Sequence, residues 1–207
     1  MNPDSQTRKR PQRLKERLRE TAAAAILDAA QEVLLEQGFQ APMETIAARA
    51  GVAVGTLYNH FADRKAMVDS LITRHRETML ADVKAAELAS RELPVKEQLT
   101  AMLAAMRVGW GRIFLIIRHS EQLPDAKKRA QIRTSVSNLF SPVLERARRE
   151  GLMAVDPNGL QVVVLEGLMK SMFIFCGDEP KRLPPEEAAQ FVVETLLHGF
   201  APKKGAR

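Results

Sequence analysis

The sequence predicts an all-α protein of about nine helices, because apolar residues recur at helical spacing along most of the chain. A three-helix helix-turn-helix domain stands first, and a long helix joins it to a helical second domain. Two further observations support this order. Gly51 separates two short amphipathic stretches within residues 44–65, and prolines stand where later helices are expected to begin, at Pro94, Pro124 and Pro185.

Residues 44–65 hold the two short helices. Ile46, Ala47 and Ala50 form one apolar face before Gly51, and Leu57 and Phe61 form the apolar pair of the second helix. A helix that buries only this pair directs its other side chains away from the core of the domain. The pattern is typical of a helix-turn-helix, whose second helix enters the DNA major groove with the residues that it does not bury.

The first helix of this domain is expected over residues 21–37. Thr21 can cap its start, and Gly38 stands where a helix end favours a left-handed residue. Pro42 suits the first turn of the next helix, since its missing N–H costs nothing there. The predicted core of the domain combines the apolar residues of all three helices: Ile26, Ala30, Leu34, Phe39, Ile46, Ala50, Val52, Leu57 and Phe61.

The composition favours a polyanionic partner. The net charge is +6 and the isoelectric point is about 9.7. The single cysteine, Cys176, excludes an internal disulfide framework and fits a reducing compartment. No apolar run approaches the roughly 20 residues that span a bilayer, and the basic N-terminal segment lacks the apolar core of a secretory signal. We therefore expect a cytoplasmic protein without membrane attachment.

Residues 1–20 form a basic arm that we expect to be disordered when free. Its charges favour contact with DNA phosphates or a minor groove, but an ordinary solvated tail has the same composition. The basic residues outnumber the acidic ones: Arg8, Lys9, Arg10, Arg13, Lys15, Arg17 and Arg19 against Asp4, Glu16 and Glu20.

The segment GFQAPMETIAARAGVAVGTLYNHFADRKAMVDSL resembles the DNA-binding domain of TetR-type transcriptional regulators. The shared elements are Gly38-Phe39, Ile46-Ala47, Ala50-Gly51-Val52, Gly55-Thr56-Leu57-Tyr58, His60-Phe61 and Arg64. The resemblance is confined to about 50 residues, and the rest of the chain is similar only in length and helical character. It implies a DNA-binding domain at 21–65 and a domain for ligand binding and dimerisation at 66–207.

By position, the resemblance implies the DNA-contacting residues Thr45, Val54, Gly55, Thr56, Tyr58, Asn59, His60, Arg64 and Lys65. Val54, Gly55, Thr56 and Asn59 would lie at or near base edges, whereas Tyr58 and His60 would contact phosphates and fix the register. Arg64 would bind phosphate with Lys65 at the start of the next helix.

Two departures from the family pattern stand out. Ala53 replaces the usual Ser that caps the recognition helix, and Ala41-Pro42 replace the usual hydroxyl residue before the preceding helix. The lost cap costs about 1 kcal/mol. Thr45 would have to supply the hydroxyl contact to phosphate instead.

A long helix is expected from Arg64 to about Arg91, with Asp63 as its cap. It would join the two domains either as a lever that reorients the recognition helix or as a rigid spacer. Its predicted buried stripe is Met67, Leu71, Ile72, His75, Met79 and Val83.

The second domain contains further helices near 94–118, 124–151, 156–176 and 185–200. Gly109 and Gly111 indicate either a break or close helix packing, and Pro142 favours a kink. The last two helices carry more apolar surface than one small domain can hide, which favours a two-fold dimer through a four-helix bundle. The predicted interface is Val164, Gly167, Leu168, Ser171, Phe175, Val192, Leu196 and Gly199.

The same domain offers a set of side chains for a lipophilic ligand, although each of them is also an ordinary core residue. Aromatic and Met side chains would form apolar walls, and charged residues would orient the ligand. The predicted ligand-binding residues are Trp110, Phe114, Arg118, Glu121, Phe140, Leu144, Met169, Met172 and Phe173, with His119 beside them.

The resemblance implies a bacterial transcriptional regulator, in the family's usual mode a repressor. It would bind a palindromic double-stranded DNA operator as a homodimer and be released by a small lipophilic effector. The alternative is a DNA-binding regulator without a small-molecule ligand, controlled by a protein partner or by abundance. An enzyme is disfavoured, because the four histidines show no metal-ligand pairing and the chain has no phosphate loop or Ser elbow. We therefore expect no catalytic residue, metal or cofactor.

Overall fold

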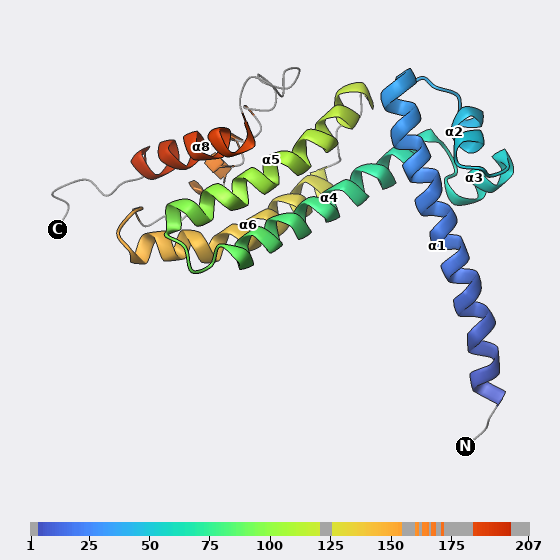
Figure 1. Cartoon of the computed structure of the whole chain (residues 1–207), viewed down its shortest axis with the longest axis horizontal. Helices are drawn as coiled ribbons and strands as arrows, with labels where there is room; N and C mark the ends of the chain where they lie inside the picture. Colours follow the sequence, from blue (N-terminus) through green and yellow to red (C-terminus); the bar gives the residue numbers. More distant parts are fainter. Residues whose placement is uncertain are drawn as a thin grey trace. The chain divides into compact units, whose positions relative to one another are not determined.

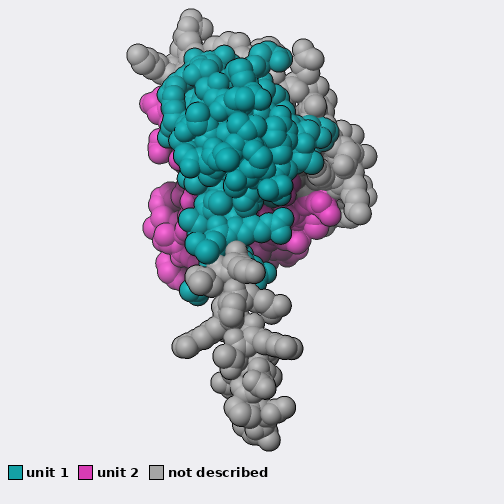
Figure 2. All heavy atoms as spheres, turned by 90° about the vertical axis from the view of Figure 1, so that its right-hand side faces the viewer, with its two compact units in different colours: residues 1–73 teal, residues 74–207 magenta. Residues whose placement is uncertain are grey.

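The computed structural model describes residues 4–120, 126–154, 160, 161, 163–165, 167, 168, 171 and 184–199, and its secondary structure is helical (Figure 1). The chain divides into two compact units, residues 1–73 and 74–207, which Figure 2 distinguishes by colour. Helix α4, Arg64–Ala89, contributes residues to both units. The expected all-α class is confirmed.

The first unit contains α1 (Asp4–Gln37), α2 (Met43–Arg49), α3 (Val54–His60) and the beginning of α4. Its core is the one that the sequence predicts, with two exceptions. Ala50 and Val52 are half-buried rather than buried, because they lie in the turn between α2 and α3. The other predicted core side chains are buried: Ile26, Ala30, Leu34, Phe39, Ile46, Leu57 and Phe61.

Helix α1 begins at Asp4, well before the predicted start at Thr21. Thr21 therefore lies inside the helix, where its hydroxyl donates to the Arg17 carbonyl over 2.9 Å instead of capping a terminus. The basic segment that we expected to be disordered is helical from Asp4 onward. Arg, Lys, Glu and Ala are all good helix formers, so the charged segment continues the helix of the apolar segment without a break.

The turns of the first unit follow simple stereochemistry. Gly38 and Gly51 have φ angles of 83° and 68°, in the left-handed region that side-chain-bearing residues avoid. Pro42 occupies the N-cap of α2 with extended backbone, not the first turn that we predicted. Asp63 caps α4 as predicted, because its carboxylate accepts a hydrogen bond of 2.7 Å from the Ala66 N–H.

The second unit contains the remainder of α4 with α5 (Val95–Ser120), α6 (Ala126–Arg149) and α8 (Pro185–Gly199). The described residues between 160 and 171 are also helical. Helix α5 returns antiparallel to α4 after a short turn (Figure 1). No helix in the described part of the chain is long and apolar enough to cross a membrane.

Helix α5 continues without interruption through Gly109 and Gly111. The absence of a side chain at Gly109 permits close packing, because a Cβ atom there would overlap Met79 Cγ and lie 3.1 Å from Met79 Cα. Of the two predicted alternatives, a break or close packing, the structure therefore shows close packing. Residues 95–120 are accordingly one helix and not two.

Helix α8 packs against α5 through one apolar face. This face consists of Ala188, Ala189, Val192, Val193 and Leu196, all buried. Lys96 Nζ and Glu194 Oε1 add an ion pair of 2.9 Å between the two helices. Val192 and Leu196, which the sequence places in a dimer interface, are each 1% exposed because the protomer itself covers them. Sequence periodicity could not show which of the two apolar stripes of α8 the protomer itself covers.

We expect Gly109→Ala to lower the free energy of unfolding by about 1–3 kcal/mol, because the new methyl overlaps the backbone and side chain of Met79. Urea denaturation measures the change. The matched control is Gly55→Ala in α3, where a Cβ meets nothing within 4 Å, and which should raise stability by up to about 1 kcal/mol through helix propensity. Equal effects of the two substitutions would contradict the close α4–α5 contact.

Candidate nucleic-acid interface

Helix α3 is held in the first unit by a minimal apolar contact. Leu57 is its only buried residue and is 0% exposed, and Phe61, directly after the helix, is 7% exposed. The Phe61 N–H donates to the Leu57 carbonyl over 2.9 Å and so continues the helical bonding to the cap. Leu57 and Phe61 therefore fix which face of α3 is turned inward and which is left outside.

The turn between α2 and α3 depends on Gly51. The Gly51 N–H donates to the Ala48 carbonyl over 3.1 Å, and the Val52 N–H reaches the Ala47 carbonyl over 3.0 Å. These two bonds satisfy carbonyls at the end of α2, and the left-handed conformation of Gly51 then redirects the chain. Ala53 caps α3 with its backbone alone, so the missing hydroxyl cap that the sequence indicates is confirmed.

The outward face of α3 consists of Val54, Gly55, Tyr58 and Asn59, which we call the α3 ridge. Their spacing of i, i+1, i+4 and i+5 places them on one side of a helix. Val54 is 36% exposed and Tyr58 is 45% exposed, and Gly55 and Asn59 are also exposed. The ridge thus combines a methyl-bearing side chain, open backbone, a phenol and an amide on a surface that a base edge or phosphate can reach.

Thr56 and His60 flank the α3 ridge and are half-buried. The ring of His60 lies 6.3 Å from that of Phe61, with the planes tilted by 39°. Both side chains are thus partly accessible beside the ridge. Thr45 in α2 is also half-buried.

Arg64 is engaged inside the first unit. Its Nη1 donates to the Phe39 carbonyl over 2.8 Å, and its Nη2 donates to the Ala41 carbonyl. The guanidinium therefore joins the start of α4 to the turn between α1 and α2. The planar fork of an arginine suits two separate carbonyl acceptors, which a lysine cannot reproduce. Arg64 is thus held by two carbonyls of the first unit, and its predicted phosphate contact stays a prediction.

Lys65 stays more available than Arg64. It forms a 2.8 Å ion pair with Asp69, one turn further along α4, and its side chain is 58% exposed. Exposed pairs of this spacing contribute only about 0.3–0.5 kcal/mol.

Arg49 forms ion pairs that the sequence-based prediction missed. Its guanidinium lies 2.8 Å from Glu36 and 3.1 Å from Glu32, so the end of α2 is paired with two successive turns of α1. The hydrogen bond from Arg49, assisted by its charge, lowers the pKa of Glu36. The available signal was the i, i+4 spacing of Glu32 and Glu36 on the polar side of the first helix.

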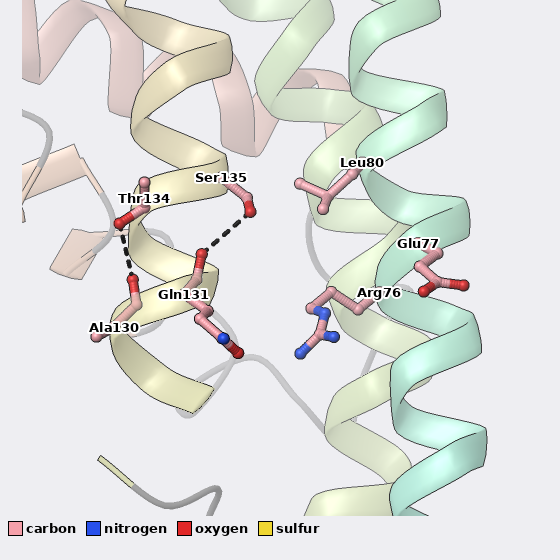
Figure 3. Close-up of a pocket in the computed structure, with 7 residues that line it drawn as sticks. All are labelled: Arg76, Glu77, Leu80, Ala130, Gln131, Thr134 and Ser135. Atoms are coloured by element: carbon pink, nitrogen blue, oxygen red, sulfur yellow. Dashed lines mark hydrogen bonds between the residues drawn. The ribbon is translucent and has the colours of Figure 1, made fainter. Parts of the chain in front are cut away.

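The predicted ligand residues are only partly within the described structure. Trp110 on α5 is half-buried, and Phe140 and Leu144 on α6 are fully buried. The side chains of Phe114 and Arg118, and the residues Glu121, Met169, Met172 and Phe173, lie outside the described residues. Among the described residues, the groove between α4 and α6 is lined by none of the predicted residues (Figure 3).

Exposed apolar side chains gather on the described helical residues between 160 and 171. Leu160 is 54% exposed, Val163 48% and Val164 38%. Of the other predicted interface residues, Gly167, Ser171 and Gly199 are exposed and Leu168 is half-buried, whereas Phe175 lies outside the described residues. The interface predicted from the sequence does not include Leu160 or Val163, although both belong to the same apolar helix.

The geometry defines a helix-turn-helix domain followed by an all-helical unit. Residues 26–71 match the family model described as bacterial regulatory proteins, tetR family. A segment of 57 residues is 39% identical to the HTH-type transcriptional regulator UidR of Escherichia coli K12. This segment is 27% of the chain and spans 29% of the length of that relative.

Solved structures extend the likeness in fold to most of the chain. LfrR of Mycobacterium smegmatis, a TetR-like transcriptional regulator in complex with proflavine, has a TM-score of 0.63 at 23% identity, covering 87% of this chain and 98% of that one. SmeT, the repressor of the Stenotrophomonas maltophilia multidrug efflux pump SmeDEF, has a TM-score of 0.60 at 19% identity, covering 87% and 91%. The likeness to the tetR family is therefore shown for the helix-turn-helix domain, and most of the chain shares the fold of these solved structures.

We expect Arg64→Lys to lower the free energy of unfolding by about 1–3 kcal/mol, because the carbonyls of Phe39 and Ala41 lose paired donors. Thermal and urea unfolding measure the loss. Lys65→Gln is the neighbouring control and should change stability by less than about 0.5 kcal/mol. Unchanged stability of the Arg64→Lys variant would show that the two carbonyl contacts do not stabilise the fold. Phosphate binding would then be the role left for Arg64.

Proposed function

We propose that the chain is a transcriptional regulator that binds double-stranded DNA through the α3 ridge. The observation that carries this proposal is the division of α3 into one buried residue, Leu57, and an exposed side that contains Val54, Gly55, Tyr58 and Asn59. A short helix held from behind in this way presents its free side to the major groove.

The chemistry of each side chain indicates whether it would contact a base or a phosphate. Asn59 offers an amide that can pair with adenine, and Thr56 and Val54 offer methyl groups suited to thymine. Open backbone at Gly55 permits close approach to the duplex. Tyr58, His60 and Lys65 would contact phosphates and fix the register. The same role for Arg64 would first require it to release the carbonyls of Phe39 and Ala41.

The basic N-terminal part of α1 would add electrostatic attraction to DNA. Arg17 and Arg19 are exposed on this helix, and the whole chain carries a net charge of +6. Each phosphate neutralised by such a residue releases a counterion, so affinity falls as salt rises. This contribution does not depend on base sequence and would support the α3 ridge without selecting the operator.

We further propose a homodimer that reads a palindromic operator. Support comes from the exposed apolar residues Leu160, Val163 and Val164, which a second copy would cover. Phe191 is 62% exposed on α8 and would extend the same kind of surface. The interface in this proposal uses Val164, Gly167, Leu168, Ser171 and Gly199 together with these residues, and no longer Val192 and Leu196.

The mode of regulation that we propose is repression in the cytoplasm, relieved by a small lipophilic effector bound in the second unit. Support comes from the two similar structures, one a complex with proflavine and the other a repressor of a multidrug efflux pump. An effector would act through its different affinity for the two states of the dimer. We infer no enzymatic activity, since the similar proteins named above are transcriptional regulators.

The decisive experiment is selection of bound duplexes from a random DNA library, followed by affinity measurements across salt concentrations. We expect enrichment of a palindrome and a steeply negative slope of log affinity against log salt. Recovery of no preferred sequence together with a slope near zero would contradict the proposal. Repetition with lipophilic compounds distinguishes an effector-controlled regulator from one controlled by a protein partner or by abundance.

Tyr58→Phe is expected to weaken binding to all duplexes by a similar factor, about threefold to tenfold, because it removes one phosphate hydrogen bond. Binding to the selected operator and to an unrelated duplex measures the effect. Asn59→Ala provides the contrasting variant, and we expect it to weaken the operator more than the unrelated duplex. A changed preference among operators in Tyr58→Phe would show that Tyr58 reads bases.

Val164→Glu should convert the dimer into monomers, because it places a charge within the apolar surface of the 160–171 segment. Sedimentation velocity measures the change in mass. The matched control is Val108→Glu on α5, where the side chain is 45% exposed on another helix, and it should leave the mass unchanged. A Val164→Glu protein that remains dimeric would show that this segment does not lie in the interface.

A further inference from the structure

Buried polar side chains in the second unit are satisfied with one exception among the described residues. Glu87 accepts hydrogen bonds from Lys84 and Arg91, and Gln161 accepts from Arg148 and donates to the Ala154 carbonyl. The exception is His75 on α4, whose Nε2 atom is buried and has no hydrogen-bond partner. A buried polar atom without a partner has lost its hydration with nothing in exchange, so its presence requires an explanation.

The surroundings of His75 follow from the register of α4 and α5. Met79 lies against Gly109, and the two helices run antiparallel (Figure 1). His75, one turn before Met79, therefore faces the part of α5 one turn beyond Gly109, where Arg112 and Ile113 lie. The position of Arg112 agrees with its electrostatic effect on the imidazole.

The site combines an apolar interior with positive charge at its edge. Met79, Ile113 and Ile116 are buried, whereas Arg112 is exposed and Arg74 is half-buried. Burial, together with the charges of Arg74 and Arg112, lowers the pKa of His75, so the imidazole is neutral near pH 7. A neutral imidazole beside two guanidinium groups disfavours a cationic ligand and favours an anionic one.

We propose that His75 and Arg112 form a subsite for the carboxylate of an amphiphilic acid, whose apolar tail lies among the interior side chains of the second unit. The Nε2–H of His75 would donate to one carboxylate oxygen, and Arg112 would neutralise the charge from the solvent side. This inference rests on the proposed function, because it gives the chemical class of the effector. It also accounts for the unpaired nitrogen, which ligand binding would satisfy.

The sole tryptophan, Trp110, lies two residues before Arg112 on α5 and gives a direct fluorescence signal. The test compares three probes of equal chain length with the DNA-free protein: octanoate, 1-octanol and octylammonium. We expect octanoate to bind at least about tenfold more tightly than either of the other two, as a charge-assisted hydrogen bond provides. Absence of octanoate binding, or equal affinities for octanoate and octanol, would overturn the proposal.

Two variants locate the carboxylate. His75→Phe keeps a ring of similar size and should abolish the preference for octanoate over octanol without loss of stability, because His75 Nε2 has no hydrogen bond to lose. Arg112→Gln alters an exposed side chain and should reduce the same preference in a folded protein. A preference that persists in either variant would overturn the subsite.

Arg76→Gln is the matched control, because it removes one positive charge next to His75 in sequence but from another side of α4. Arg76 lines the groove between α4 and α6 with Glu77, Leu80 and Gln131 (Figure 3). The preference for octanoate should survive this change, and its loss would show that general positive charge, not the His75 site, selects the acid. Since no DNA is present, failure here is separate from failure of operator binding.

Discussion

The burial of Leu57 is the contact on which the DNA-binding surface depends. Helix α3 has only seven residues, and one of them is fully covered by the first unit. An isolated helix of this length is unstable in water, so its conformation and its orientation both come from this tertiary contact and from the turn at Gly51. Every residue of the α3 ridge is exposed as a consequence of where Leu57 and Phe61 are placed.

Helix α4 provides the second constraint. In the first unit, Arg64 fixes the start of α4 to the carbonyls of Phe39 and Ala41, and in the second unit Met79 packs against Gly109. The same continuous helix therefore takes part in a polar contact with the turn between α1 and α2 and in an apolar contact one turn from His75. If α4 acts as a lever, a ligand in the second unit changes the Arg64 contacts, whereas a rigid spacer leaves them unchanged.

The sequence predicted the all-α fold and the core of the first unit because periodicity and glycine positions report local stereochemistry directly. Leu57, Phe61 and Gly51 were assigned correctly on these grounds. It could not show that Arg64 bonds backbone carbonyls, since such acceptors carry no residue-specific signal. It also could not show that Val192 faces the protomer and Phe191 faces outward, because both belong to an apolar helix with two usable stripes. The sequence also places the start of α1 too late, because a strongly charged segment rich in Arg, Lys and Glu can be helical as well as disordered.

The most direct measurement uses Tyr58, the only tyrosine of the chain. Incorporation of fluorotyrosine gives a single ¹⁹F resonance on the α3 ridge, and titration with the selected duplex at low salt reports contact at that site. The account predicts that this resonance shifts on DNA binding and returns when salt is raised. A resonance that stays in place while fluorescence anisotropy shows the duplex to be bound would contradict DNA recognition through α3.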